Sequence, residues 1–376
     1  MIDNNKIVEA LRTVNDPATG QDIIKRRMIE GLKIEGDNVN FTLVLPTLNM
    51  GNKTELIFAC IAAIQKEYPQ AQTNVHTLAR PTVRQDSHGE GAGSTAAKAA
   101  DRPFPHLKNI IAVASGKGGV GKSTVAVNLA LGLQALGAKV GIMDADVYGP
   151  SIPTMLGLQG QRPKLQEVYG TPKMQPLEAY GMQVISIGNI IEPEQAVVLR
   201  GPRLAGVIKQ FFNDTLWGEL DYLVVDLPPG TGDVQLTLVQ TVPVTGVVVV
   251  TTPQEVAVID AVKAINMFLL PQVNVPILGI VENMSWFTPD DMPDRQYKIF
   301  GEGGGKKLAK QSNSLLLGQI PLVIGIREGG DAGKPAVVGD EPITKAAFIN
   351  VAQNVARQIA LRNEMLEPTQ KVNMQL

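Results

Sequence analysis

The first 79 residues show a mixed pattern of hydrophobic positions. Apolar residues at helical spacing predict two helices, and alternation of apolar with polar residues predicts three short strands. The predicted elements are a helix that ends at Asp16, strands over residues 29–34 and 39–45, a helix over residues 54–68, and a strand over residues 75–78. We therefore expect residues 1–79 to form a small α/β domain.

From residue 110 onward, short and nearly continuous runs of Val, Ile and Leu alternate with helical stretches. Such runs are typical of strands buried on both faces, in a parallel sheet with helices on each side. The predicted strands are residues 110–114, 140–143, 184–187, 223–225, 247–250, 277–281 and 315–320. A last helix is predicted over residues 342–361. We expect residues 106–362 to form an α/β domain with a mostly parallel sheet and helices on both faces.

Two segments lack the pattern of a packed domain. Residues 80–103 contain a single large apolar residue, Val83, among Gly, Ala, Ser and charged residues. Such a segment buries too little apolar surface to offset the entropy of ordering it, so we expect a flexible linker over residues 80–105. Residues 363–376 contain Pro368 and show weak periodicity, and we expect a mobile C-terminal tail.

Composition and charge narrow the functional classes. The chain has 376 residues, of which 44% are hydrophobic and 19% charged, and its net charge is −2. This balance gives no electrostatic reason to expect nucleic acid or an anionic membrane as a partner. The sequence lacks an uncharged apolar run of about 18 residues and a signal-peptide pattern, so we expect a cytoplasmic protein. The single cysteine, Cys60, excludes a disulfide framework within one chain.

Residues 116–123, GKGGVGKS, match the phosphate-loop pattern G-x-x-x-x-G-K-[ST] between a predicted strand and a helical stretch. Glycines let successive backbone N–H groups turn toward phosphate oxygens, and the helix N-terminus adds positive charge. Lys122 is predicted to contact the β- and γ-phosphates of ATP, and the Ser123 hydroxyl to bind Mg²⁺. The predicted nucleotide contacts are Gly116, Lys117, Gly118, Gly119, Val120, Gly121, Lys122, Ser123 and Thr124. A glycine turn with a chance Lys-Ser pair is the alternative, and the context disfavours it.

Acidic residues follow two later strands. Asp144 and Asp146 follow the strand over residues 140–143, which we expect to lie beside the phosphate loop, and Asp226 follows the strand over residues 223–225. Ligands of open α/β sheets bind at the carboxyl ends of the strands, so both loops are predicted to face the nucleotide. Phosphoryl transfer uses a carboxylate near Mg²⁺ and another group that positions water. An ordinary acidic helix cap is the alternative for each loop alone.

The motifs carry a family resemblance. GKGGVGKST, with its additional Lys117, resembles the deviant phosphate loop of the ATPases that include MinD, ParA and the nitrogenase iron protein. Four further stretches resemble the Mrp/ApbC iron–sulfur carrier branch: DADVYGPS (144–151), LPPGTGD (227–233), VENMS (281–285) and IPLVIGIREGGDAGKP (320–335). Residues 1–79 resemble the small domain of iron–sulfur assembly factors. The resemblance implies a P-loop NTPase fold and a homodimeric, Mg²⁺-dependent ATPase that delivers clusters to apoproteins.

The resemblance also implies roles for the acidic residues and for Lys117. Lys117 would reach the phosphates bound to the partner subunit, in the manner of an arginine finger. Asp146 would orient the hydrolytic water, and Asp144 and Asp226 would support the Mg²⁺ shell.

A second set of implied roles concerns the base. Asn283 matches the family position that reads the adenine edge, and Pro321 and Arg327 would pack near the base. The alternative for Asn283 is a turn or helix cap.

The chain departs from the family at the cluster ligands, which are two cysteines in a Cys-x-x-Cys just after the N-M-S segment. Residues 283–301, NMSWFTPDDMPDRQYKIFG, contain neither cysteine nor histidine. Iron–sulfur clusters are held overwhelmingly by thiolates, with occasional histidine ligands. The acidic residues there, which are hard oxygen ligands and read best as a solvated loop, are Asp290, Asp291 and Asp294.

The remaining candidate ligands lie elsewhere in the chain. Cys60 lies in an apolar stretch, where a buried and inert thiol is the better interpretation. His76, His88 and His106 show no ligand spacing, and we interpret them as surface residues.

Three functions remain open from the sequence. The first is an ATP-dependent iron–sulfur cluster carrier, and the second is a cluster-free ATP-switched adaptor in cluster assembly. The third is a positioning ATPase like MinD or ParA. It is disfavoured because the tail has no basic amphipathic helix and the chain has no excess of positive charge.

Overall fold

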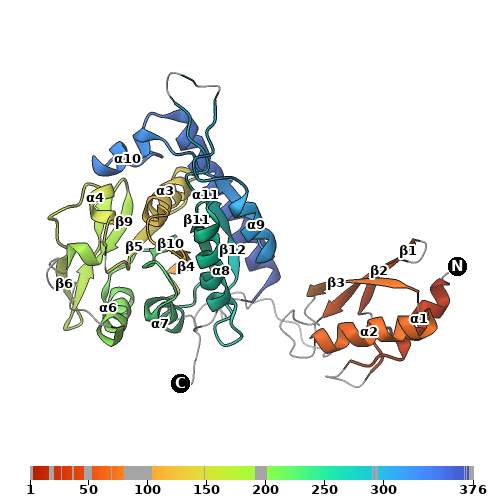
Figure 1. The fold of residues 1–376 in the computed structure, drawn as a ribbon. Coiled ribbons are helices and arrows are strands. Elements are labelled where there is room, and N and C mark those ends of the chain that lie inside the picture. The colour runs from red at the N-terminus through yellow and green to blue at the C-terminus, as the bar shows by residue number, and fades with distance from the viewer. Residues whose placement is uncertain are drawn as a thin grey trace. The chain divides into compact units, whose positions relative to one another are not determined.

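The computed structural model divides the chain into two compact units, residues 1–92 and 93–376 (Figure 1). The structure describes residues 3–16, 21–26, 28–35, 38–45, 53–68, 70–79, 104–147, 149–190, 201–289, 292, 295–367, 369 and 371. The predicted linker residues 80–103 and the tail residues Pro368, 370 and 372–376 lie outside this range. Each unit is described by itself.

The first unit is a three-stranded sheet packed against helices. Its elements are α1 (Asn4–Arg12), β1 (Ile29–Glu35), β2 (Asn38–Leu45), α2 (Lys53–Glu67) and β3 (Gln72–Ala79). β2 is the central strand, antiparallel to β1 and parallel to β3. The predicted small α/β region is confirmed, with each expected helix and strand present. Cys60 lies in its core with no exposed surface, as expected, and burial raises the pKa of its thiol to about 12.

The second unit is built on an eight-stranded sheet in the order β13-β12-β11-β4-β10-β5-β9-β8. The first seven of these are parallel, and the edge strand β8 is antiparallel to β9. The strands are β4 (Leu107–Ala114), β5 (Val140–Asp144), β8 (Leu177–Ala179), β9 (Met182–Ser186), β10 (Leu220–Asp226), β11 (Gly246–Thr251), β12 (Ile277–Glu282) and β13 (Leu316–Gln319). The predicted mostly parallel sheet is therefore confirmed.

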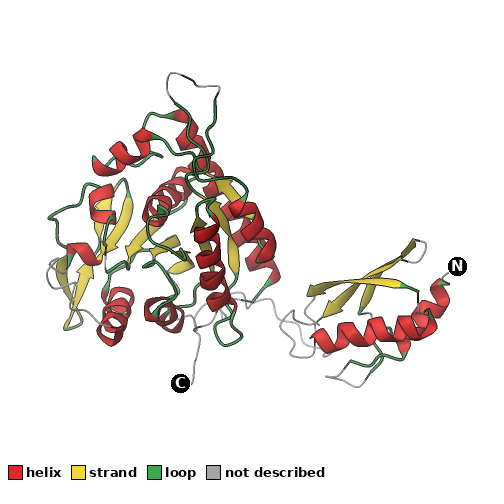
Figure 2. Cartoon of the chain, viewed as in Figure 1, coloured by secondary structure: helices red, strands yellow, loops and turns green. Residues whose placement is uncertain are grey.

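Helices cover both faces of this sheet (Figure 2). The described helices of this unit are α3 (Lys122–Ala135), α4 (Ile152–Met155), α6 (Gly201–Asp214), α7 (Asp233–Thr241), α8 (Glu255–Leu269), α9 (Gly304–Gln311), α10 (Ile324–Asp331) and α11 (Pro342–Met365), and α10 packs on α4 and has no buried residue. Alternate residues of β4 enter opposite cores: Ile110 and Ala112 pack with residues of α6, α7 and α8, whereas Ile111 and Val113 pack with residues of α3 and α11. Both faces of the strand are thus buried, which explains its continuous apolar run.

Several details differ from the sequence-based expectation. The strand before Asp144 does not lie beside the phosphate-loop strand, because β10 lies between β5 and β4. Residues 363–365 of the expected tail are helical, since α11 continues to Met365. Phe104, within the expected linker, is buried, and its ring centre lies 5.8 Å from that of Phe212 in α6.

Three strands of the second unit were not predicted, namely the edge strand β8 and the two strands of a hairpin. A hairpin of β6 (Lys164–Val168) and β7 (Thr171–Gln175) forms a separate two-stranded sheet. Its sequences are short and mostly polar, so no buried face marks them as strands. In the described part of the chain, no helix is both long and apolar enough to cross a membrane.

Candidate nucleotide-binding site

The loop between β4 and α3 is shaped by glycines that other residues could not replace without strain. Gly119 and Gly121 have φ values of 80° and 79°, in the left-handed region that favours glycine. A Cβ on Gly116 would lie 2.1 Å from the carbonyl carbon of Asp260 in α8, and one on Gly121 would lie 2.1 Å from Asn283 Nδ2. The loop therefore packs against two later segments of the chain.

Lys122 is the centre of a buried charged cluster at this loop. Its ammonium lies 2.7 Å from Asp226 Oδ1, 3.4 Å from Asp146 Oδ2 and 3.2 Å from Ser123 Oγ. Lys122 is 6% exposed and Asp226 has no exposed surface. The structure thus brings together four of the predicted site residues. A buried ammonium requires such partners, because an unpaired buried charge is strongly destabilising.

Asp144 and Asp226 face each other across neighbouring strands of the sheet. Burial, together with the charge of Asp226, raises the pKa of Asp144 to about 7, although a hydrogen bond from Ser186 opposes this. Burial also raises the pKa of Asp226, and Lys122 opposes that shift. Two buried carboxylates at this edge of the sheet favour a bound cation.

Asp144 also fixes the loop that follows it. Its carboxylate accepts hydrogen bonds from Ser186 Oγ at 2.8 Å, from the backbone N–H of Asp146 at 3.1 Å and from that of Ile152 at 3.4 Å. These contacts hold Asp146 close to Lys122, so Asp144 positions its neighbour rather than facing the loop directly.

The oxygen atoms at this site suit a magnesium nucleotide. Asp226 Oδ2 and Asp146 Oδ1 are buried and have no hydrogen-bond partner among the described residues. Carboxylate and hydroxyl oxygens are the ligands that Mg²⁺ prefers, and nucleotide sites leave several of its positions to phosphates and water. The described residues contain no group of three His, Cys, Asp or Glu side chains that could hold a metal ion.

The other predicted phosphate-loop residues lie around this cluster. Lys117 and Gly118 are exposed, and Val120 is buried. No described residue forms an ion pair with the Lys117 ammonium; only its carbonyl has a contact, from Ser115 Oγ at 3.0 Å. Lys117 is therefore not part of the Lys122 cluster, and its predicted action on a partner subunit stays a prediction.

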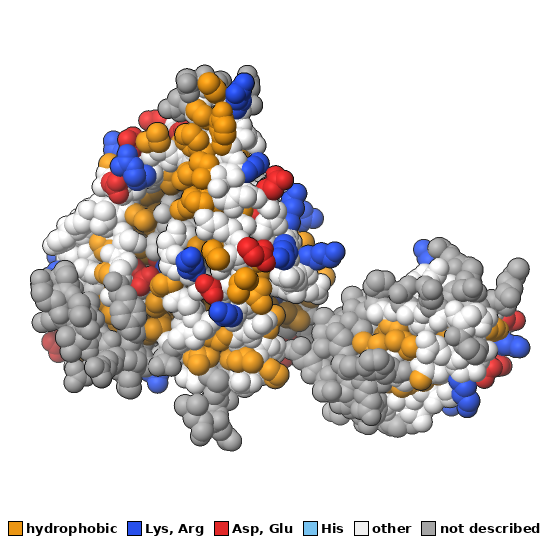
Figure 3. Space-filling model, viewed as in Figure 1, with side chains coloured by type: hydrophobic (Ala, Val, Ile, Leu, Met, Phe, Trp, Pro, Cys, Tyr) orange, Lys and Arg blue, Asp and Glu red, His pale blue; other side chains and the backbone are white. Residues whose placement is uncertain are grey.

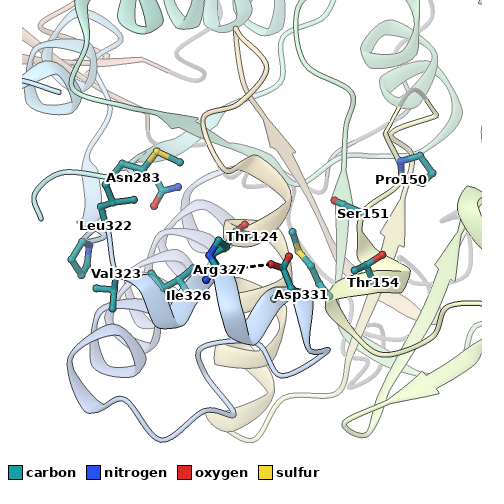
Figure 4. Close-up of a pocket in the computed structure, with 14 residues that line it drawn as sticks. Thr124, Pro150, Ser151, Thr154, Asn283, Leu322, Val323, Ile326, Arg327 and Asp331 are labelled. Atoms are coloured by element: carbon teal, nitrogen blue, oxygen red, sulfur yellow. Dashed lines mark hydrogen bonds and ion pairs between the residues drawn. The ribbon is translucent and has the colours of Figure 1, made fainter. Parts of the chain in front are cut away.

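Beside the phosphate loop lies a cavity of about 450 Å³. The three residues predicted to lie near the base, Asn283, Pro321 and Arg327, all line it, as does Thr124 of α3. Figure 4 shows Asn283 and Leu322 on one side, Thr154 on the other, and Arg327 paired with Asp331 between them at 3.3 Å. Among the lining residues that the sequence analysis missed are the apolar Met155, Leu322, Val323 and Ile326.

Asn283 connects this cavity to the phosphate loop. Its Nδ2 donates a hydrogen bond of 2.9 Å to the carbonyl of Val120. This fixes the orientation of the amide, because a carbonyl cannot donate to Oδ1. The Oδ1 atom has no hydrogen-bond partner among the described residues and is left as an acceptor on a residue that lines the cavity.

Two buried side chains near the site were not predicted. Gln235 of α7 donates from Nε2 to the carbonyls of Pro228 and Gly230, at 2.9 and 3.0 Å, and the N–H of Gly230 donates to Ser115 at 2.8 Å. Glu282, which precedes Asn283, accepts hydrogen bonds from Gly305, Ser285 and Gln319. The sequence signal for Glu282 is a carboxylate that ends an apolar strand, whereas Gln235 lies in a helix with several other polar residues and has no such signal.

A glycine-rich loop between a central parallel strand and a helix, with buried Lys122 and acidic strand ends, defines a P-loop NTPase. The family model described as the NUBPL iron-transfer P-loop NTPase matches residues 106–359, and one described as an iron–sulfur cluster assembly protein matches residues 4–76. The chain therefore belongs to the NUBPL iron-transfer P-loop NTPase family.

Relatives extend over nearly the whole chain. An iron–sulfur cluster carrier protein from Synechocystis is 44% identical over 362 residues, which cover 96% of this chain and 99% of the relative. The carrier protein of that name from Escherichia coli K12 is 52% identical over 261 residues, 69% of each chain.

Two solved structures share the fold of the second unit. The nucleotide-binding protein of Archaeoglobus fulgidus in complex with ADP is 37% identical, with a TM-score of 0.56 over 66% of this chain and 95% of that one. The septum site-determining protein MinD of Pyrococcus horikoshii, complexed with Mg-ADP, is 23% identical, with a TM-score of 0.50 over 68% of this chain and 99% of that one.

Proposed function

We propose that the protein is an ATP-binding and ATP-hydrolysing factor that serves iron–sulfur cluster delivery to apoproteins. The observation that carries the ATPase assignment is the buried cluster of Lys122 with Ser123, Asp146 and Asp226 at the phosphate loop. The iron–sulfur part of the proposal rests on relatives that are named cluster carriers and on the assembly domain matched at residues 4–76.

In this proposal, Lys122 exchanges one anionic partner for another. Its ammonium is held by Asp226 and Asp146, and it moves to the β- and γ-phosphates when ATP binds. Backbone N–H groups of residues 116–122 hold the phosphates, and Ser123 and Asp226 would hold Mg²⁺, which neutralises phosphate charge when bound. Asp146, held in place by Asp144, orients the attacking water.

The free acceptor on Asn283 supports adenine as the base. The exocyclic amino group of adenine is a donor and complements Oδ1, whereas guanine presents a carbonyl oxygen at the same position. Asn283 Oδ1 and the guanine carbonyl oxygen are both acceptors and cannot form a hydrogen bond with each other. A buried polar group without a partner raises the free energy of the complex by about 1–3 kcal/mol. Pro321 and Leu322 supply apolar surface for the ring.

A homodimer completes the proposal. Lys117 is exposed at the mouth of its own loop and has no anionic partner among the described residues. An exposed lysine at this position is suited to contact phosphates bound to a second copy of the chain. A cytoplasmic location likewise remains a prediction.

The test compares three lysine variants in steady-state hydrolysis and in binding of a fluorescent ATP analogue. Lys122→Ala should abolish hydrolysis because it removes the charge that stabilises the transferred phosphate. Lys117→Ala should lower turnover more than nucleotide affinity. Lys173→Ala is the matched control. The Lys173 ammonium in β7 pairs with Asp214 at the end of α6, so this variant should leave turnover and nucleotide affinity unchanged. Unchanged turnover in Lys122→Ala would refute the site assignment.

The iron–sulfur part is tested separately. The full chain with ATP is added to apo-aconitase together with ferrous iron and sulfide, and recovery of aconitase activity is followed. Faster recovery that requires ATP supports the proposal, and a rate equal to that without the chain contradicts it.

A further inference from the structure

Cluster chemistry requires thiolates, and the second unit of this chain has none. Iron–sulfur clusters are bound through cysteine thiolates, with histidine replacing some of them in a minority of sites. The one cysteine of the sequence, Cys60, belongs to the first unit. Relatives of this chain are named iron–sulfur cluster carrier proteins, and a cluster bound by this chain would need ligands among its own residues.

Cys60 does not meet that need. Its side chain is fully buried in the core between α2 and the three-stranded sheet, with Leu56 and Ile64. Burial raises the pKa of the thiol to about 12, so it is protonated at neutral pH. The thiolate is the form that binds metal, and this thiol is inert while the unit is folded.

Pro289 and Met292, in the loop after β12, have the spacing of the two cysteines of a Cys-x-x-Cys motif, and neither side chain is a thiolate. The N–H of Met292 donates to the carbonyl of Pro289 at 3.1 Å. Such an i to i+3 bond closes a four-residue turn and brings its ends within about 7 Å. Proline offers no ligand atom, and the neutral Met292 thioether is a weak ligand that lies 4.0 Å from the Tyr297 hydroxyl.

The rest of the loop presents aromatic, aliphatic and cationic groups. Phe287 and Tyr297 form an antiparallel pair with backbone hydrogen bonds of 2.9 and 2.8 Å, and the Lys298 ammonium lies 5.0 Å from the Trp286 ring centre. Tyr297 and Ile299 are largely exposed. In Figure 3 this part of the second unit, at the top of the view, carries a band of hydrophobic side chains.

Nitrogen and oxygen ligands do not replace the thiolates. The loop contains no histidine, and His106 precedes β4, at the end of that strand opposite the phosphate loop. Asp290, Asp291 and Asp294 lie outside the described residues, and carboxylates are hard ligands suited to Mg²⁺ or Ca²⁺. The residues present therefore do not fit a cluster.

We infer that this chain holds no iron–sulfur cluster with its own side chains, and that the cluster it serves stays on thiolates of another molecule. The chain then acts as an ATP-switched docking factor between donor and recipient. The transfer is a ligand exchange: each iron–thiolate bond that breaks is replaced by one to an incoming thiolate. The incoming thiol releases a proton, the outgoing thiolate takes one up, and no electron moves.

This inference rests on the proposed function for its ATP switch and cargo, but its test is independent of hydrolysis. The full chain is reconstituted anaerobically with ferrous iron and sulfide, without added thiol, and iron and sulfide are counted after desalting. We expect no stoichiometric retention in the wild type or in Cys60→Ala. A ferredoxin treated in parallel verifies that the conditions build clusters.

A gain-of-function variant makes the negative result informative. Pro289→Cys/Met292→Cys places two thiols at the ends of the existing turn, and a dimer would supply four. This variant should retain iron, sulfide and the visible absorbance of a thiolate-bound cluster, whereas the matched Pro289→Ala/Met292→Ala variant should not. A folded double-cysteine variant that takes up no cluster would overturn the inference that the loop lacks a cluster site only because it lacks thiols.

The wild type gives the decisive outcomes. Stable, stoichiometric iron and sulfide on the wild type would overturn the inference. Loss of both in Cys60→Ala would then make Cys60 a ligand, and their retention would identify oxygen or nitrogen ligands. Two further arms add glutathione or a reduced apo-ferredoxin. A cluster that coelutes with the chain in one arm identifies a small-molecule thiol or a protein thiolate as its holder.

Coelution in neither arm would overturn the proposal that the chain handles a thiolate-held cluster. Hydrolysis measured on the same preparations separates this result from the proposed function. An active ATPase that retains no cluster by itself but coelutes with one in a thiol arm supports both proposals, and an active ATPase without coelution in either arm contradicts the inference alone. A preparation without hydrolysis contradicts the proposed function alone.

Discussion

Gln235 fixes the loop between β10 and α7, whose Gly230 N–H donates to the carbonyl of Ser115 next to the phosphate loop, and Gln235→Met tests the importance of that bracing. The side chain is 1% exposed, and both of its hydrogen bonds go to carbonyls of this loop, those of Pro228 and Gly230. Methionine has a similar length and fills the space, so the variant removes the two donors without opening a cavity.

The structure sets the size of the effect. Each lost hydrogen bond contributes about 1 kcal/mol, and leaving the buried Pro228 carbonyl without a donor adds to this, whereas the Gly230 carbonyl lies closer to water. The variant also removes Gln235 Oε1, a buried acceptor without a hydrogen-bond partner among the described residues, and this offsets part of the loss. The net cost is about 1–2 kcal/mol, which corresponds to a melting temperature lowered by about 2–8 °C for a unit of this size. We expect kcat for ATP to fall about tenfold, because the loop adjoins Asp226, with a smaller change in nucleotide affinity.

The assay combines thermal unfolding, followed by the signal of the second unit, with steady-state hydrolysis and ATP-analogue binding. Gln240→Met, on the same helix, is the matched control, since the Gln240 side chain has no hydrogen bond to another described residue. It should leave stability and kcat unchanged. The reasoning is refuted if Gln235→Met matches this control, or if kcat is preserved while the melting temperature falls as expected.

Two further predictions concern the base and the last helix. Asn283→Ala removes the free acceptor and the bond to Val120, so the preference for ATP over GTP should fall by about tenfold in competition binding, while Asn283→Asp keeps the acceptor. Burial raises the pKa of Glu341, but hydrogen bonds from Thr344 and Ile343 at the start of α11 outweigh it and lower the pKa overall. The stabilisation that the Glu341 carboxylate contributes is therefore fully present above the pKa that this group has in the unfolded chain. It is lost as the pH falls through the pKa that the group has in the folded protein. Glu341→Ala should cost about 1 kcal/mol in urea unfolding at neutral pH, with a gap from the wild type that narrows in acid.

Local residue types explain what was predictable from the sequence. The central strands β4, β5, β10, β11 and β12 are buried on both faces, and their apolar runs located each end to within three residues. The polar strands β6 and β7 and the short edge strand β8 were missed. The phosphate loop is likewise a local feature, because the left-handed Gly119 and Gly121 and the adjacent Lys122 lie within a few residues of one another. Helix α11 began at Pro342 as expected but continued past Leu361.

Features that depend on contacts between distant segments were harder to predict from the sequence. The order of strands placed β10 between β4 and β5, and no local pattern distinguishes that order from the one expected. Gln235 and Glu282 are polar residues whose partners come from loops and helix ends that only the fold brings together. Asn283, Pro321 and Arg327 came from family resemblance, and their placement in one cavity required α3, α4 and α10 to meet.

The site and the cysteine-free loop are joined through a single strand end, and this bears on how ATP could act without a bound cluster. Asn283 contacts the phosphate loop through Val120, and two residues later Ser285 begins the loop that carries Trp286 and Tyr297. Glu282 closes the other end of that loop, since its carboxylate accepts from the N–H of Gly305 at the start of α9 at 2.6 Å. Hydrogen bonds thus connect the phosphate loop and the start of α9 with the two ends of the loop that carries Trp286 and Tyr297. That route requires hydrogen bonds and packing, and no thiolate takes part in it.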